Sequence, residues 1–168
     1  SAAIDGDGAA DADMRARRRS GESWFSSAYA ALISEERMTS DSEFKAHMAK
    51  ILPFYFADVA KIEQFDFDRE TFSAEADMMM SVNKESFSHG VLDRLPALDL
   101  PAVIAVGDDD FVCSPVQAMR IHLPLKGSKL VIVDDAGHFP WLENPAMFYT
   151  SLESALQRVG AISAGVSA

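Results

Sequence analysis

The sequence predicts an α/β fold in which a helical segment precedes a short parallel β-sheet. Two apolar runs rich in β-branched residues, 102–106 and 129–133, have the length and composition of strands. Residues 115–123 between them have helical spacing, so the three segments form a βαβ unit. Because both runs are apolar on two faces, we expect strands that are buried on both sides in a parallel sheet.

Length and composition are those of one packed domain with an acidic surface. The chain has 168 residues, of which 48% are hydrophobic, and its net charge is −11. This charge argues against nucleic acid and anionic membranes as partners, and no run approaches the roughly 20 apolar residues of a membrane span. A single cysteine, Cys113, excludes an internal disulfide framework and is compatible with a reducing compartment. Since no signal peptide is recognised, we expect a cytoplasmic location.

Residues 1–19 are interpreted as a surface lead-in. The first thirteen are mostly Ala, Gly and Asp, and four arginines follow within positions 15–19. An EF-hand calcium loop is not expected, because its sixth and twelfth positions would be Ala10 and Ala16 instead of Gly and Glu. In so acidic a chain, the arginines favour a solvated helix face over a basic binding patch.

Residues 20–90 are helical in pattern, and no alternating strand pattern occurs between residues 14 and 95. We expect one helix capped by Ser20 or Ser23 and a second capped by Ser40 or Asp41. Pro53 interrupts the second helix. A short helix over 54–62 and another over 66–83 are predicted to follow.

The C-terminal part returns to the sheet. Residues 95–101 are an extended approach, since each proline there keeps the preceding residue out of a helix. Ser114 is expected to cap the helix between the strands, and Asn144 to cap a final helix that begins at Pro145. Residues 160–168 are predicted to be a flexible tail.

Residues able to do chemistry follow each predicted strand. Asp108, Asp109 and Asp110 come directly after the first strand, and His138 follows the second. The carboxyl ends of parallel strands meet at one edge, where ligands bind in open α/β sheets, so a carboxylate and His138 are expected to meet there. The three acids could instead form a divalent-metal cluster, but no phosphate-binding groups accompany them. We therefore expect no metal and no cofactor.

The remaining candidates are weaker. His47 and His122 lie inside helical patterns and are interpreted as structural or surface residues. Cys113 lacks the strand-turn-helix elbow of a nucleophile and is interpreted as a buried, inert thiol.

The spacing Gly107-x-x-Asp110 and the pair Gly137-His138, followed by Phe-Pro-Trp-Leu-Glu-Asn-Pro, resemble the C-terminal part of an α/β-hydrolase. The resemblance covers residues 96–158 and is nearest to the prolyl iminopeptidase, esterase and amidase branch. It implies that Asp110 and His138 are the acid and base of a Ser-Asp-His triad, with Asp109 as the alternative acid. It also implies a helical cap domain over 20–90 and the C-terminal part of the core over 91–159.

The resemblance further implies a substrate pocket beneath the cap. Trp24, Phe25, Phe54 and Phe139 are the candidate substrate-binding residues. The alternative is that such aromatic residues form the core of the cap itself.

The family's nucleophile elbow, Gly-x-Ser-x-Gly, is absent; the nearest match, residues 21–25, lacks the second glycine and a preceding strand. We therefore expect the sheet to be completed by a separate N-terminal chain from the same precursor, carrying the serine. Two exposed edges of a two-stranded sheet support this expectation. Ser1 could be a self-cleavage residue acting by an N-to-O acyl shift, although cleavage by another protease or an expression scar would also leave it.

The expected activity is that of a serine hydrolase acting on a small-molecule ester or amide. A transacylase or cyclase on the same fold is an alternative. A hydrolase-like scaffold that binds a ligand or partner without turnover is the other.

Overall fold

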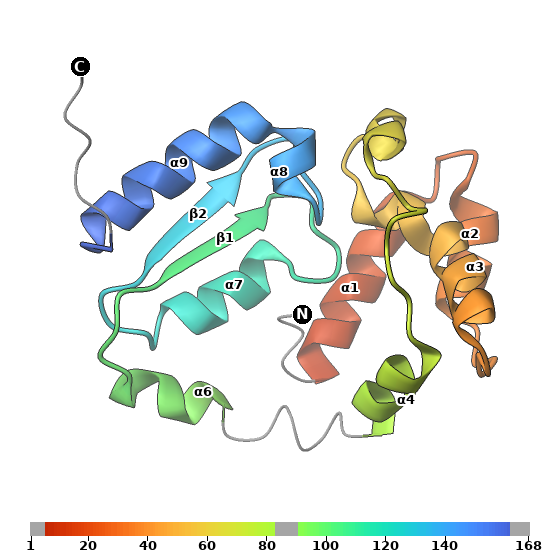
Figure 1. Cartoon of the computed structure of the whole chain (residues 1–168), viewed down its shortest axis with the longest axis horizontal. Coiled ribbons are helices and arrows are strands. Elements are labelled where there is room, and N and C mark those ends of the chain that lie inside the picture. The colour runs from red at the N-terminus through yellow and green to blue at the C-terminus, as the bar shows by residue number, and fades with distance from the viewer. Residues whose placement is uncertain (1–5, 83–90, 162–168) are drawn as a thin grey trace.

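A computed structural model describes residues 6–82 and 91–161 (Figure 1). A helical region comes first, and two strands with a helix between them follow. Two further helices come after the second strand. In order, the bounds are α1 Gly6–Arg18, α2 Phe25–Leu32, α3 Asp41–Ile51, η1 Leu52–Tyr55, η2 Val59–Gln64, α4 Ala74–Val82, α6 Val91–Arg94, η3 Leu95–Ala97, β1 Val103–Gly107, α7 Pro115–His122, β2 Lys129–Val133, α8 Pro140–Glu143 and α9 Pro145–Arg158.

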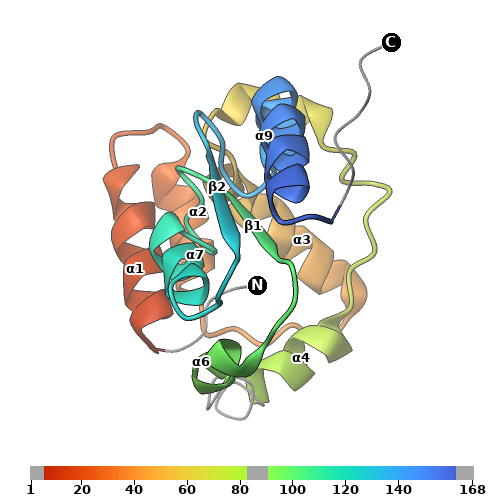
Figure 2. The same ribbon diagram turned by 90° about the vertical axis from the view of Figure 1, so that its left-hand side faces the viewer.

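Strands β1 and β2 form a parallel two-stranded sheet, in register from Val103 opposite Lys129 to Gly107 opposite Val133. Helix α7 covers one face and α9 the other (Figures 1 and 2). The predicted βαβ unit is confirmed, with its first strand starting one residue later than expected. The prediction that the strands are buried on both faces is wrong for Ile132, which is 38% exposed. One helix on each face cannot cover every side chain of a sheet that has no further strand within 6–82 and 91–161.

Polar side chains begin several helices as the sequence predicts. Ser40, Ser114 and Asn144 each accept a hydrogen bond from the backbone N–H three residues on, which identifies them as the N-caps of α3, α7 and α9. The predicted cap of α2 is wrong. That helix starts after Trp24, which makes no side-chain capping bond, and neither Ser20 nor Ser23 has this role.

The lead-in is a helix, which the sequence analysis did not predict for residues 6–13. Helix α1 is supported by ion pairs one turn apart, from Arg15 to Asp11 and from Arg17 to Asp13. Tyr29 of α2 also donates to Asp13 at 2.6 Å. The helix is not a surface appendage, because Ala16 is fully buried.

The helix predicted over 66–83 is shorter. Helix α4 starts only at Ala74, whose N–H donates to the Asp41 carboxylate at 2.9 Å. Before it, Phe67 and Phe72 pack together with ring centroids 4.8 Å apart, so these residues gain packing in place of helical bonds. The predicted end at Asn83 lies outside the described residues, as do Ser1 and 162–168 of the expected tail.

Two buried clusters hold the elements around the sheet. One joins α1, α2, η1 and the loop after β1 through Ala16, Ala28, Phe54 and Phe111. The other packs β2 against α9. Helices α1–α3 gather beyond the carboxyl ends of both strands (Figure 1). None of the helices described is long and apolar enough to cross a membrane.

Candidate active site

The loops that leave β1 and β2 are packed backbone against backbone. A Cβ built on Gly107 would overlap the carbonyl oxygens of Ala136 and Gly137, so only glycine permits this approach. The N–H of Asp109 donates to the Ala136 carbonyl at 3.0 Å, and the Ala136 N–H donates to the Asp108 carboxylate at 3.2 Å. The two loops therefore form one unit.

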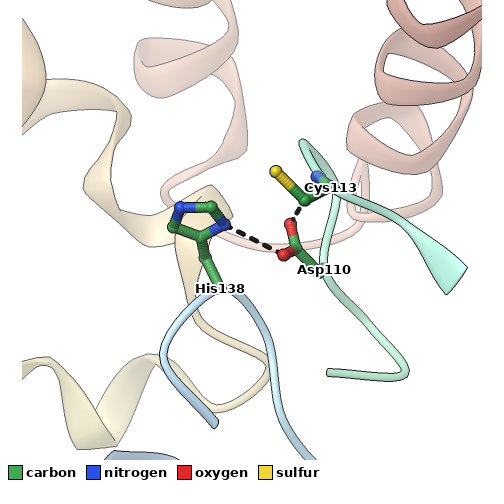
Figure 3. A group of neighbouring side chains, drawn as sticks. All are labelled: Asp110, Cys113 and His138. Atoms are coloured by element: carbon green, nitrogen blue, oxygen red, sulfur yellow. Dashed lines mark hydrogen bonds and ion pairs between the residues drawn. The ribbon is translucent and has the colours of Figure 1, made fainter. Parts of the chain in front are cut away.

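This unit brings Asp110 and His138 together (Figure 3). His138 Nδ1 lies 2.9 Å from Asp110 Oδ2. The other oxygen, Oδ1, accepts from the N–H groups of Val112 and Cys113, each at 2.9 Å. The carboxylate is only 5% exposed, so its orientation is fixed by the turn that carries it. The predicted contact between Asp110 and His138 is confirmed.

The neighbouring acids have other partners. Asp109 lies 3.6 Å from an Arg19 nitrogen, and Asp108 accepts from the Ala136 backbone. The three acids thus do not form the metal cluster considered from the sequence, and Asp109 is not the residue that meets His138.

The imidazole of His138 is partly buried, and its side chain is 29% exposed. Burial lowers the His138 pKa, but hydrogen bonds to the side chains of Asp110 and Cys113 and the charges of both outweigh burial and raise the pKa to about 9. With Nδ1 directed to Asp110, Nε2 is the nitrogen through which the neutral ring can accept a proton.

Glu143 supports the histidine loop and was missed by sequence reasoning. Its carboxylate accepts from the N–H of Gly137 at 2.6 Å, of Ala57 at 2.8 Å and of Asp58 at 3.2 Å. Glu143 is 4% exposed, and its burial raises its pKa although these bonds oppose the change. The signal was its place in the segment after His138, but only the fold shows what it holds.

Residues 55–57 pack directly under the histidine. The His138 N–H donates to the Tyr55 carbonyl at 2.7 Å. A Cβ on Gly137 would overlap that same carbonyl, so this glycine also permits a close backbone approach. The helical region and the histidine loop are therefore in contact at the backbone.

Aromatic rings flank the imidazole. Tyr55 and Phe139 each lie edge-on to it, with centroids 5.3 Å away. Burial, followed by the charge of Asp110, raises the Tyr55 pKa to about 12, so its hydroxyl is neutral. Phe139, one of the candidate substrate-binding residues, thus lies beside the imidazole, as does Tyr55, which the sequence analysis does not single out.

The other candidate substrate-binding residues, Trp24, Phe25 and Phe54, pack among themselves and against Phe111 instead of against the imidazole. Phe54 is 2% exposed and packs against Phe111, Trp24 and Phe25, with centroids 5.6, 5.0 and 5.9 Å apart. This placement favours the packing interpretation for Phe54, Trp24 and Phe25.

Helix α1 holds the loop that carries Asp110. Ser114 donates its hydroxyl proton to the Asp11 carboxylate, and Arg15 Nη1 donates to the Asp108 carbonyl at 3.4 Å. The start and the end of the loop are thus both fixed to one helix.

The interpretation of the arginines as a solvated face is correct only in part. Arg17 is 62% exposed, but the side chains of Arg15 and Arg19 are 12% and 16% exposed. Arg19 donates to the Phe56 carbonyl at 2.8 Å and lies over the Trp24 ring. Arg19, directly after helix α1, therefore links the helical region to the acidic loop through Asp109.

Cys113 is not the buried thiol expected. It is partly exposed, and its side chain is hydrogen-bonded to His138. The turn that lets Asp110 accept from the Cys113 N–H also carries this thiol to the imidazole. His122, in contrast, is bonded to Ser128 Oγ at 2.6 Å on the last turn of α7 and has the structural role expected.

A shallow hollow between β2 and α9 lies apart from the pair of Asp110 and His138. It is bordered by Ile132, Ser154 and Arg158, among others, and includes neither Asp110 nor His138. Its lining brings no pair of acid and base together, so it is not part of the candidate site.

The chain has the fold of part of an α/β-hydrolase, as comparison with solved structures shows. One is the enzyme Est816, described as degrading N-acyl homoserine lactones: the TM-score is 0.53 at 19% identity, over 76% of this chain and 50% of that one. Another is an alpha/beta fold family hydrolase from Bacillus anthracis str. Sterne, with a TM-score of 0.51 at 18% identity, over 80% of this chain and 46% of that one.

The chain thus spans about half the length of these solved structures. No protein-family model matches it, and no curated protein matches it.

Proposed function

We propose that this chain contributes the acid and the base of a serine hydrolase of the α/β-hydrolase type. The observation that supports this most directly is the 2.9 Å contact between Asp110 Oδ2 and His138 Nδ1 at the carboxyl edge of a parallel sheet. The structural neighbours support the fold alone, because they are only 18–19% identical to this chain, so the proposed activity rests on this pair.

In the proposed mechanism, Asp110 accepts the Nδ1 proton of His138 in a hydrogen bond and fixes the ring tautomer. His138 Nε2 takes the proton of a serine hydroxyl as that oxygen attacks an ester or amide carbonyl, and the protonated ring then donates to the leaving group. A water molecule then attacks the acylated serine, with His138 again as the base, and the carboxylic acid is released. Transfer to another acceptor would use the same pair.

The serine and its oxyanion donors would come from polypeptide outside these 168 residues. We propose an N-terminal half of the same precursor, bound as a second chain and extending the sheet. The two-stranded sheet supports this, since strands with unpaired edges need a partner. The single cysteine is consistent with a cytoplasmic location for the complex.

The test is intact-mass analysis of the protein isolated from its natural source, combined with labelling by a fluorophosphonate probe. A companion chain with a Gly-x-Ser-x-Gly segment that carries the label supports both parts of the proposal. Label on the serine of one longer continuous chain supports the hydrolase and contradicts the split. If neither this chain nor a companion is labelled while the preparation is folded, the binding scaffold is the better explanation.

A further inference from the structure

Three side chains of different chemistry meet at the site, and the proposed hydrolysis uses only two of them. A carboxylate oxygen of Asp110, a ring nitrogen of His138 and the Cys113 sulfur all lie within 4.8 Å of one another. Asp110 and Cys113 come from the loop after β1 and His138 from the loop after β2 (Figure 3). We propose that these side chains form a binding site for a thiophilic divalent cation, Zn²⁺, and that the bound metal disables the acid-base pair.

The donor set selects the metal. Thiolate and imidazole are ligands for Zn²⁺, whereas Mg²⁺ and Ca²⁺ prefer sites made of oxygens. In a tetrahedral zinc site with bonds of about 2.0–2.3 Å, ligand atoms are roughly 3.5 Å apart. Side-chain adjustments of about an ångström would therefore suffice to close the ligands around the ion.

The charges also match. A Cys113 thiolate and the Asp110 carboxylate together neutralise Zn²⁺ while His138 coordinates as a neutral ring. The thiol proton is released to solvent, and so is a proton of the imidazole if the ring is protonated. No electron is transferred, so no oxidant or reductant is needed.

The ligands are held before the metal arrives. Asp110 is fixed by the Val112 and Cys113 N–H groups, and the loop of His138 is fixed to Glu143 through Gly137. The His138 side chain is 29% exposed, so an ion and a water molecule as fourth ligand can reach the ring from solvent. A site with three protein ligands and one open position is typical of accessible zinc.

Metal binding by itself does not depend on the proposed function, but its effect on turnover does. Once Asp110 and His138 coordinate the ion, the carboxylate no longer orients the ring and the ring no longer accepts the serine proton. The protein would thus be inhibited by Zn²⁺ and reactivated by a chelator.

The test is titration of the protein, as isolated and reduced, with Co²⁺ as the spectroscopic substitute for Zn²⁺. We expect one equivalent bound per chain, with a thiolate-to-cobalt charge-transfer absorption that Zn²⁺ displaces. Cys113→Ser should abolish the absorption, and Asp110→Asn and His138→Gln should each weaken binding by about tenfold or more. Circular dichroism confirms that each variant is folded.

Matched controls are Asp109→Asn on the same loop and His122→Gln, whose ring is bonded to Ser128. Both should titrate like the unmodified protein. The proposal is overturned if folded protein shows no thiolate absorption with Co²⁺, or if Cys113→Ser binds the metal as tightly as the parent. If no hydrolysis is found at all, this titration still decides whether the metal site exists.

Discussion

Gly107 and Gly137 touch through their backbones, which is how two loops from neighbouring strands come close enough for Asp110 to reach His138. Neither position has room for a Cβ: one at Gly107 would meet the Gly137 and Ala136 carbonyls, and one at Gly137 would meet the Tyr55 carbonyl. The glycines of the two sequence motifs are therefore requirements of packing at the site.

Gly107→Ala should separate the loops. Because the added methyl group meets backbone atoms that cannot rotate away, we expect a loss of unfolding free energy of about 1–3 kcal/mol and a weaker contact between Asp110 and His138. Urea unfolding and the NMR signals of the His138 ring measure the two effects. Gly21→Ala is the control, since no atom lies within 4 Å of its added Cβ. Equal stability of the two variants would contradict the packing argument.

Removing the base or its acid should abolish hydrolysis by the complete protein. Under the proposed function, we expect His138→Ala to lower kcat by about 10⁶ and Asp110→Asn by about 10⁴, the losses seen when the triad residues of serine proteases are replaced. Asp109→Asn, which alters the residue that pairs with Arg19, should have a much smaller effect. Steady-state kinetics with an ester substrate measures all three, and near-normal turnover by His138→Ala would refute the assignment.

The pH dependence should follow His138. Its pKa is raised from 6.5 to about 9, so turnover that needs the neutral ring should increase as pH rises through about 9. The linked stability has the opposite trend. A raised pKa in the folded state stabilises the protein fully below pH 6.5, and that contribution is lost as pH rises through about 9.

NMR titration of the His138 ring tests this directly. In Asp110→Asn the burial that lowers the pKa remains while the bond that raises it is lost, so the His138 pKa should fall. The same titration in Asp109→Asn should change little. An unchanged His138 pKa in Asp110→Asn would show that another group raises it.

Glu143→Gln should loosen the histidine loop. An amide replaces one of the two carboxylate oxygens with a donor, which leaves at least one of three backbone N–H groups without an acceptor. We expect a loss of about 1–3 kcal/mol and faster hydrogen exchange at the Gly137 amide. Glu153→Gln on the exposed side of α9 is the matched control. Unchanged exchange at Gly137 would mean that Glu143 does not hold the loop.

Aromatic substitutions should separate core from pocket. Phe54→Ala should lower stability by about 3–5 kcal/mol and leave relative substrate rates unchanged, because the ring is buried in the helical core. Trp24→Ala should act in the same direction with a smaller loss. Phe139→Ala, beside the imidazole, should change the order of preferred substrates. Thermal melts and competition between two esters test these effects. A changed substrate preference in Phe54→Ala would contradict the packing interpretation and make Phe54 a substrate-binding residue.

Local patterns predicted what is encoded locally. The strands follow from β-branched runs, the caps from Ser114 and Asn144, and the contact of Asp110 with His138 from two strand ends and their glycines. The remainder depends on residues distant in sequence. Nothing near Asp11 indicates that it accepts from Ser114, and nothing near Glu143 indicates that it binds the backbone of Ala57.

Helix α1 and Cys113 show the same limit. The low hydrophobicity of residues 6–13 favoured a surface segment, but ion pairs one turn apart and the burial of Ala16 make it a helix. The sequence neighbours of Cys113 predict an inert thiol, whereas the imidazole opposite sets its chemical environment.

The hydrogen bonds at residues 55–58 have a consequence for how selectivity should be expressed. Tyr55 accepts from the His138 N–H, Glu143 accepts from Ala57 and Asp58, and Lys61 donates to the Glu143 carbonyl at 2.7 Å. A ligand that displaces residues 55–58 would therefore also disturb the loop that carries the imidazole. Under the proposed function, a poorly fitting substrate would therefore lower kcat as well as raise KM, because it disturbs the base together with the binding surface.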